Sequence, residues 1–360
     1  MNILLIGEYS AFHNLLKKGL VLGGHTVTLA AYGDGFKQLP ADILWNSNSK
    51  YPGKLIDFFN VNKSIKNLRD FDVVQFINPE IFSRKFNFNE IAINRLIHQN
   101  KKSFLIAAGD DCVVWDYWKN PAKNNERYTW IEDGLKYELA NKDLPWEKDS
   151  FINFQNRLIS KINGIIPIMY EYAVAYRNRN ISNVRRTIGI PINVDEIIYN
   201  ENKIKNGKLV VFHGLNRYGT KGTMHVEKAF EYLRKKYPGD LELIIGDRLP
   251  FHEYLEILDR TNVVIDQTNS YSFGINALIS MAKGKIVLGG AEPEANLELG
   301  YEFNPAINIL PNPQSIISAI ENLLDAKIKL FEIAEKSRRF VETYHDYRSI
   351  AKEYVYEWNK

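Results

Sequence analysis

Residues 263–290 read VVIDQTNSYSFGINALISMAKGKIVLGG, and this stretch decides the fold class. Its apolar start predicts a strand over 263–266, a polar loop follows, and residues 274–283 are predicted to form a helix. A second apolar strand is predicted over 286–289. Strands that are apolar throughout are typical of parallel sheets covered on both faces. The stretch therefore predicts a strand–helix–strand unit of an α/β fold.

The same rhythm continues on both sides of this stretch. Further strands are predicted at 2–6, 26–30, 72–77, 103–107, 164–168, 209–212 and 241–245. Further helices are predicted at 12–22, 89–98, 226–235, 251–258 and 313–326. Residues 115–146 are rich in Trp, Tyr, Lys and Asn without a clear period, so we expect an excursion with short helices near the end of a strand.

A linker near Pro191 divides the pattern, which restarts after a polar segment at 199–208. We therefore expect two Rossmann-like α/β domains, residues 1–190 and 191–340, with a C-terminal helix in 341–360 that returns to the first domain. Ligands of open α/β sheets bind at the carboxyl ends of the strands. Two such domains facing one another predict a site in the cleft between them.

Composition limits the class of protein. The chain has 360 residues, of which 45% are hydrophobic and 25% charged, as in folded globular proteins. The single cysteine, Cys112, allows no intrachain disulfide, which indicates a reducing compartment. No run approaches the roughly 20 apolar residues of a membrane span, and residues 2–6 are interpreted as a buried strand rather than a signal peptide. We expect a cytoplasmic protein.

Charge is divided unevenly along the chain. Residues 1–190 contain 25 lysines and arginines against 19 acidic residues, whereas the rest contains 21 against 24. A basic first half favours an anionic partner. The basic residues are scattered rather than gathered in a stripe, so we expect no nucleic acid. The alternatives for the anionic partner are a phosphorylated acceptor and peripheral contact with the anionic inner membrane surface.

Residues 214–223, GLNRYGTKGT, follow a predicted strand and lead into a predicted helix. Glycines such as Gly214 let the backbone approach a phosphate, and a helix N-terminus presents free N–H groups. Asn216 is polar, and Arg217 and Lys221 add two positive charges. Thr220 stands where a nucleoside-triphosphate loop requires lysine, so that class is excluded. The loop predicts diphosphate binding; the alternative is a surface loop with incidental charge.

A second candidate anion site lies in the opening stretch itself. Ser270 and Ser272 precede a helix that starts around Gly274 and Ile275, with Phe273 between them. Small polar residues at a helix N-terminus leave its N–H groups available to a ligand. This helix start is therefore also predicted to bind the ligand.

With these motifs in place, the chain resembles GT-B-fold glycosyltransferases of family 4, also called group 1. The family signature resembles Glu-Gly-Phe-Gly, four residues, and Glu-Ala-Met-Ala-x-Gly-x-Pro-Val. It is matched at Phe273, Gly274, Met281, Ala282, Gly284 and Val287. The family's Arg-x-x-x-Lys-Gly loop is matched at Arg217 and Lys221-Gly222, its linker at 190–195, and its Gly-His-x-Val turn at 24–27.

The resemblance implies the activity. It implies a glycosyltransferase whose first domain receives the acceptor and whose second binds a nucleotide-diphosphate sugar, with Arg217, Lys221 and the amides near Ser272 holding the diphosphate. Asp247 and Arg248 would lie near the base. Transfer would retain the anomeric configuration and need no metal and no cofactor. The acceptor would be a glycan or lipid-linked intermediate of bacterial surface polysaccharide.

The two signature glutamates are replaced, by Tyr271 at the donor-sugar position and Ile279 at the ribose position. A tyrosine can still hydrogen-bond, whereas an isoleucine cannot. We therefore expect the nucleotide to be held differently, or catalysis to be impaired. The alternatives are thus a nucleotide-sugar epimerase of the same architecture and a catalytically impaired nucleotide-sugar-binding protein.

Candidate acceptor residues follow the strands of the first half. Asp110 and Asp111 come after the strand at 103–107 and could orient an acceptor hydroxyl or accept its proton; the alternative is a turn with Asp as a helix cap. Other acceptor-side candidates are Glu8, Tyr9, His13, Tyr170 and Glu171. For His13 the alternative is a structural histidine. The loop after the first strand lacks Gly-x-Gly-x-x-Gly, which argues against a dinucleotide.

Overall fold

The computed structural model describes residues 1–35, 38–45, 53–215, 217–247, 251–325 and 329–360. The chain divides into two compact units. Unit 1 comprises residues 1–115, 145–191 and 347–360, and unit 2 comprises residues 116–144 and 192–346. The chain therefore passes from one unit to the other at four places. The expected division near 190 coincides with one of them, but residues 116–144 differ from expectation because they pack with unit 2.

Unit 1 contains a six-stranded parallel sheet in the part of the chain that the structure describes. Its order, β3-β2-β1-β4-β5-β6, is that of the Rossmann fold. The strands are β1 Asn2–Ile6, β2 Thr26–Ala31, β3 Ile43–Leu44, β4 Val73–Phe76, β5 Lys102–Ala107 and β6 Gly164–Pro167. The central strand β4 is buried at every residue because the sheet is covered on both faces.

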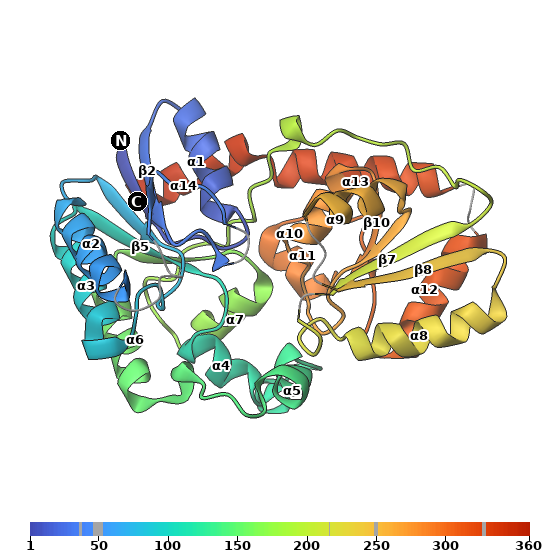
Figure 1. The fold of residues 1–360 in the computed structure, drawn as a ribbon, viewed down its shortest axis with the longest axis horizontal. Helices are drawn as coiled ribbons and strands as arrows, with labels where there is room; N and C mark the ends of the chain where they lie inside the picture. The colour runs from blue at the N-terminus through green and yellow to red at the C-terminus, as the bar shows by residue number, and fades with distance from the viewer. Residues whose placement is uncertain (36–37, 46–52, 216, 248–250, 326–328) are drawn as a thin grey trace. The chain divides into compact units, whose positions relative to one another are not determined.

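Helices cover both faces of this sheet (Figure 1). They are α1 Phe12–Leu22, α2 Gly53–Asn67, α3 Phe88–His98, the start of α4 Cys112–Trp118, α6 Asp149–Lys161, α7 Tyr170–Asn178 and α14 Tyr347–Asn359, with short turns η2 Lys85–Asn87 and η5 Pro145–Glu147. Helix α14 packs on α1. Gly19 permits this approach, since a Cβ there would lie 2.2 Å from the Tyr347 carbonyl oxygen. The last helix is thus part of the first unit's core.

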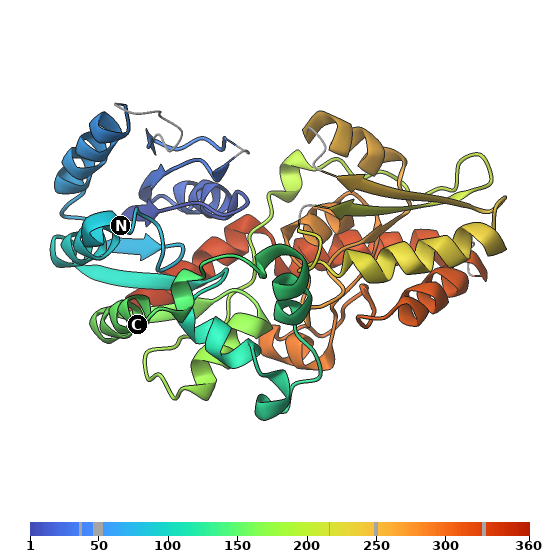
Figure 2. The same cartoon turned by 60° about the horizontal axis from the view of Figure 1, so that its bottom comes forward.

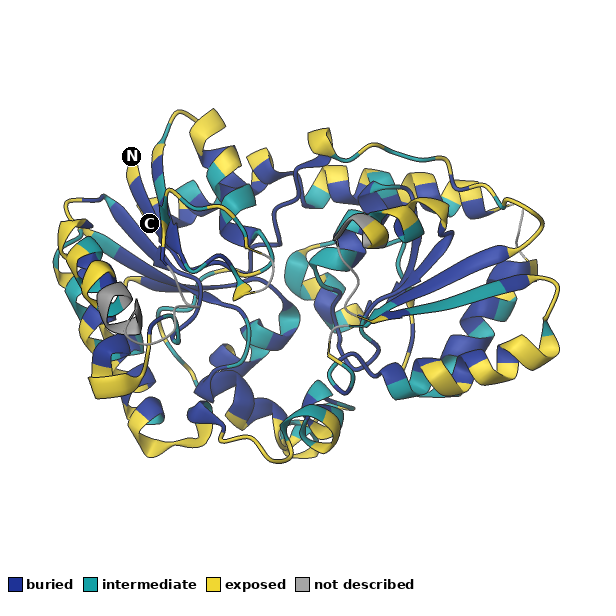
Figure 3. Cartoon of the chain, viewed as in Figure 1, coloured by how far each residue is buried: buried dark blue, intermediate teal, exposed yellow. Residues whose placement is uncertain are grey.

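Unit 2 has a five-stranded parallel sheet, counted over its described residues, in the order β11-β10-β9-β7-β8. The strands are β7 Leu209–Leu215, β8 Leu241–Asp247, β9 Val263–Ile265, β10 Ile286–Gly289 and β11 Ile307–Asn308. Figure 3 shows the inner strands in the colour of buried residues and the edge strand β8 as partly exposed. The predicted α/β class with two parallel sheets is confirmed.

Unit 2 has helices on both faces of its sheet and further helices within residues 116–144 (Figure 1). They are the end of α4, α5 Trp130–Gly134, α8 Thr223–Lys236, α9 Phe251–Arg260, α10 Ile275–Ala282, α11 Pro293–Leu299, α12 Pro313–Asp325 and α13 Leu330–Tyr344, with short turns η3 Pro121–Asn124, η4 Leu135–Leu139 and η6 Val194–Glu196. Figure 2 shows α8 and α12 side by side, and their apolar residues form one core with alternate residues of the strands. Helices α10 and α13 pack together on the other face.

Candidate functional site

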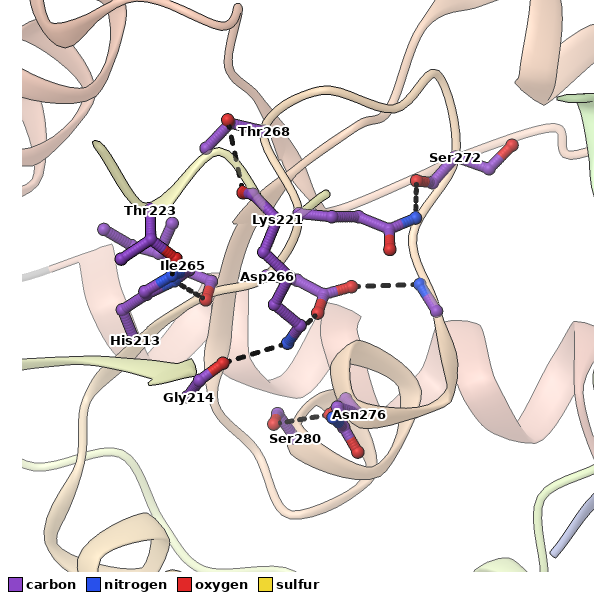
Figure 4. Close-up of polar contacts among 12 residues, drawn as sticks. His213, Gly214, Lys221, Thr223, Ile265, Asp266, Thr268, Ser272, Asn276 and Ser280 are labelled. Atoms are coloured by element: carbon purple, nitrogen blue, oxygen red, sulfur yellow. Dashed lines mark hydrogen bonds and ion pairs between the residues drawn. The ribbon is translucent and has the colours of Figure 1, made fainter. Parts of the chain in front are cut away.

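Lys221 and Asp266 join two loops at the carboxyl end of the unit 2 sheet (Figure 4). The Lys221 ammonium donates to the Gly214 carbonyl (3.1 Å) and to Oδ1 of Asp266 (3.3 Å). The other oxygen of Asp266 accepts the N–H of Gly274 (3.0 Å), the residue that precedes α10. Both side chains are largely buried. One carboxylate therefore fixes the basic loop, which we define as residues 217–223, to the start of α10.

His213 supports the same loop from inside β7. Its Nδ1 lies 3.0 Å from the Ile265 carbonyl oxygen, which can only accept, so Nδ1 carries the proton. Its Nε2 then accepts from the Thr223 hydroxyl (2.9 Å). Burial, aided by the positive charge of Lys221, lowers the pKa of His213 to about 4. A neutral histidine of defined tautomer thus holds the first residue of α8.

Gly222 of the basic loop, directly before α8, has a left-handed backbone with φ +67°. A Cβ on this residue would lie 2.0 Å from Oγ1 of Thr268 and 2.6 Å from Oδ1 of Asn269. The Thr268 N–H donates to the Lys221 carbonyl (3.1 Å). The loop after β9 therefore packs directly on the basic loop, and only glycine fits the contact.

The basic loop already binds a carboxylate. Glu138 accepts the N–H of Thr220 at Oε1 (3.0 Å), and its Oε2 accepts the Thr220 hydroxyl (3.2 Å). The Arg217 guanidinium donates to the same Oε2 (3.4 Å). A main-chain amide, a hydroxyl and a guanidinium converge here, which is the donor set that proteins use for phosphate.

Tyr271, at the expected donor-sugar position, is buried among residues of the segment 116–144. Its ring stacks on Tyr128 (centroids 4.8 Å apart) and lies 5.6 Å from Trp118. Its hydroxyl accepts the N–H of Arg127 (2.8 Å). Burial raises the pKa of Tyr271 to about 12. The residue is a packing element in this structure.

The remaining donor-side residues lie around this point. Ser270 and Ser272 are buried, and Gly290 packs against their carbonyl oxygens. Phe273 packs edge-on against Phe340 of α13. Ile275 and Ile279 are half-buried on α10, and Asp247 is exposed at the end of β8. Asn216 and Arg248 lie outside the described residues.

In unit 1, Tyr9 follows β1 and Asp110 follows β5, with β4 between these two strands. The Tyr9 ring lies against Gly109, where an added Cβ would be 3.2 Å from Cε2. Asn78, after β4, donates to the carbonyls of Ala108 (2.8 Å) and Asp110 (3.3 Å). Burial, with the charges of Glu80 and Asp110, raises the pKa of the Tyr9 hydroxyl. These residues therefore form the partly exposed edge of the first sheet.

Asp111 is fully buried and caps α4. Its Oδ1 accepts the N–H groups of Val113 (2.8 Å) and Val114 (2.9 Å), and its Oδ2 accepts the Tyr176 hydroxyl (2.6 Å). Burial raises the pKa of Asp111. The residue has the geometry of a helix cap, the alternative considered for it above, so we assign it that role.

Glu8 and His13 also have structural partners. Glu8 accepts the N–H groups of His13 (3.2 Å) and Asn14 (2.9 Å) in the first turn of α1. His13 is fully buried; Nδ1 donates to the Gly7 carbonyl (2.7 Å) and Nε2 faces the amide of Gln75 (3.3 Å). Burial lowers the pKa of His13 to about 4. Both ring nitrogens are engaged, so the ring holds the strand to the helix.

Tyr170 and Glu171 form the first turn of α7, where Glu171 is buried and Tyr170 half-buried. Among the described residues, no group of three His, Cys, Asp or Glu side chains could hold a metal ion. Nor does any helix in these ranges have the length and apolar content of a membrane span.

Several residues that build the site are not among the sequence candidates. Asp266 was visible as the polar end of a strand, and His213 as a lone polar residue in an apolar one, so both had a local signal. Glu138, Arg127 and Tyr128 had none. They lie in the aperiodic segment 116–144 and reach their partners across 82 to 164 residues.

No protein-family profile and no curated protein sequence matches the chain at a significant level. Many solved structures resemble the chain, among them the following three, which match almost its whole length. Sucrose-phosphate synthase of Thermosynechococcus elongatus is 14% identical (TM-score 0.64; 100% of this chain, 98% of that one). Anabaena HepE, solved with UDP and glucose, is 13% identical (0.62; 100% of both chains). The UDP-GlcNAc 2-epimerase of Neisseria meningitidis, solved with UDP-GlcNAc, is 12% identical (0.52; 99% of both).

At 12–14% sequence identity, these comparisons show the fold alone. Each unit of the chain carries its own parallel Rossmann-like sheet, and the similar structures cover both units together. The chain therefore has the GT-B fold.

Proposed function

We propose that this chain is a glycosyltransferase that binds a nucleotide-diphosphate sugar through unit 2. The observation that carries the proposal is the anion-binding character of the basic loop. Thr220 and Arg217 already hold a carboxylate, and Lys221 adds a second fixed positive charge beside the start of α10. Such preorganised donors stabilise a departing diphosphate. HepE was solved with UDP and glucose, and we infer the same class of ligand here.

For the acceptor we propose a glycan or lipid-linked sugar of bacterial surface polysaccharide, with transfer that retains the anomeric configuration. The motif resemblance supports both points. The excess of basic residues in residues 1–190 supports contact with a phosphorylated acceptor or with anionic lipid at the inner membrane surface. In unit 1, the partly exposed edge with Tyr9 and Asp110 is the candidate acceptor surface. We propose no cofactor and no metal.

The test is a binding panel of UDP-, GDP-, ADP- and dTDP-sugars on the full chain, with Arg217→Ala as the variant. Loss of a charge-assisted hydrogen bond should weaken donor binding by about 1.5–3 kcal/mol. Arg260→Ala is the matched control, because Arg260 is 48% exposed and pairs with one carboxylate, Glu242, as the 45% exposed Arg217 pairs with Glu138. Equal donor affinity in wild type and R217A would refute the assignment of the loop.

A nucleotide-sugar epimerase is the second candidate, favoured by the similarity to the UDP-GlcNAc 2-epimerase. Incubation with UDP-sugars in the absence of any acceptor separates the two enzymes, since only an epimerase then yields a new sugar. The half-buried Ile279, where the family has a carboxylate, supports a third candidate, a binding protein with impaired catalysis. That candidate predicts donor binding without turnover on any acceptor.

A further inference from the structure

Residues 116–144, which we define as the lid segment, contact the loops that follow three strands of unit 2. After β7 they reach the basic loop, after β9 they reach Asn269 and Tyr271, and after β10 they reach Glu292 and Glu294. The carboxyl ends of parallel strands are where ligands of α/β sheets bind. The segment therefore lies on the edge where the proposed function requires a donor.

One end of the lid segment, residues 118–128, which we define as the anchored end, has several strong contacts. The Arg127 guanidinium pairs with Glu292 (2.8 Å) and Glu294 (2.9 Å), and it lies 5.1 Å above the Tyr271 ring. The Tyr128 hydroxyl donates to Glu292 (2.6 Å). Two ion pairs, a short hydrogen bond and ring stacking act together. Moving this end would break all of these contacts at once.

The other end, residues 133–142, contacts the basic loop and its neighbour through polar groups and through one edge-on ring contact, Tyr137 on Tyr218 (5.3 Å). Asp133 accepts from the Asn269 amide (2.8 Å), and its carbonyl oxygen would lie 2.2 Å from a Cβ at Gly219. Glu138 takes the N–H and hydroxyl of Thr220 and the guanidinium of Arg217. A carboxylate on these donors resembles a phosphoryl group in its negative charge and in its acceptor oxygens.

We propose that Glu138 occupies the place of a donor phosphate and that the lid segment opens at this end when a diphosphate displaces it. This inference rests on the proposed function. Because one set of donors cannot serve two anions, the Glu138 carboxylate and the diphosphate compete. The anchored end, around Arg127 and Tyr271, stays in place and serves as the pivot.

The experiment measures binding of inorganic pyrophosphate and of UDP to three full-length proteins by calorimetry. They are the wild type, Glu138→Gln and the control Glu132→Gln, which removes the same charge from an exposed position of the lid segment. E138Q loses the competing charge and should bind both anions about tenfold more tightly, whereas E132Q should match the wild type. Hydrogen exchange of the wild type should rise in residues 133–142 on adding pyrophosphate and stay unchanged in residues 118–128.

The outcomes separate the two proposals. If the wild type binds UDP but E138Q binds it equally or more weakly, Glu138 only positions the loop and the lid proposal is overturned, while the donor site stands. Unchanged exchange in residues 133–142 with pyrophosphate bound overturns it as well, without recourse to any variant. If none of the three proteins binds UDP or pyrophosphate, the proposed function fails and the lid proposal fails with it.

Discussion

The hydroxyl of Tyr271 accepts a hydrogen bond of 2.8 Å from the backbone N–H of Arg127, 144 residues earlier in the chain. The sequence resemblance predicts that this tyrosine takes the place of a glutamate that contacts the donor sugar. In this structure the ring and the hydroxyl of Tyr271 instead contact the anchored end of the lid segment. The residue predicted to stand at the donor-sugar position therefore makes an internal contact.

Tyr271→Phe should loosen that end. The ring stacking is kept, but the partly buried N–H of Arg127 loses its acceptor, which costs about 1 kcal/mol. Hydrogen exchange should rise in a peptide that covers residues 125–130. Tyr356→Phe, at a 59% exposed position, serves as the control and should change nothing there. Equal exchange in Y271F and wild type would show that the hydroxyl does not hold the segment.

Gly222 and Gly300 form a matched pair, since both have φ +67° and ψ +33° and both belong to unit 2. Around Gly300 a Cβ would meet nothing within 4 Å, whereas at Gly222 it would lie 2.0 Å from Thr268. Gly300→Ala should cost only the left-handed backbone term, about 1–2 kcal/mol. Gly222→Ala should cost several kcal/mol more and weaken nucleotide binding. Similar melting temperatures for the two variants would contradict the packing of the two loops.

Acid should destabilise unit 2. The pKa of His213 is about 4 in the folded protein and about 6.5 in the unfolded chain, so the unfolded state binds more protons as the pH falls between these values. Stability is therefore present above pH 6.5 and is lost on acidification, by roughly 2 kcal/mol between pH 7 and pH 5. Burial also lowers the pKa of His225, which adds in the same direction. Calorimetric unfolding at the two pH values measures the effect.

His213→Asn isolates the residue responsible. An asparagine amide can still donate to the Ile265 carbonyl but cannot titrate, so the pH dependence should become shallower even if the variant is less stable overall. His98→Asn, at an exposed helix position, should keep the wild-type slope. An unchanged slope in H213N would assign the acid sensitivity to other groups.

Ile279→Glu tests the ribose position. The side chain is half-buried on α10, so a glutamate can reach water and the fold should persist. If the helix is aligned with the family signature, the new carboxylate should tighten nucleotide binding by about 1–2 kcal/mol, the net value of a hydrogen bond to a charged group. Ile279→Gln should give a smaller gain. A lower melting temperature without tighter binding would mean that the alignment is shifted here.

The fold was largely predictable because local apolar periodicity determines its elements. Every predicted strand corresponds to an observed one within two or three residues. Helix α6 was not predicted, although Phe151, Phe154 and Leu158 carry the helical spacing, so the signal was present and missed. The assignment of residues 116–144 could not have been predicted in the same way. That segment has no period, and its place is decided by contacts with residues far along the chain.

The candidate site also contains residues that local motifs predict and residues whose role only the packed structure shows. Lys221 and Gly274 were visible from their local motifs, and the structure adds that one carboxylate, Asp266, joins them. Asp111 and His13 carry the residue types of a catalytic site, but their burial and hydrogen bonds are properties of the packed core. Residue type and spacing indicate which chemistry is available. They do not indicate which side chains are buried and hydrogen-bonded within the core.

The interleaving of the two units has a consequence for biosynthesis. Residues 116–144 leave the ribosome well before Tyr271 and Glu292. Synthesis proceeds at about 5–20 residues per second, so Trp118 and Tyr128 emerge on the order of ten seconds before the residues that they contact. Unit 1 is no better placed, because α14 supplies Trp358, whose indole N–H donates to Gln75 in the middle of the first sheet (3.1 Å). Unit 1 cannot complete its core during translation until residues 347–360 have emerged, and unit 2 cannot do so until residues 271–346 have emerged. Deletion of residues 347–360 should therefore unfold unit 1, because it removes Trp358 and the packing of α14 on α1.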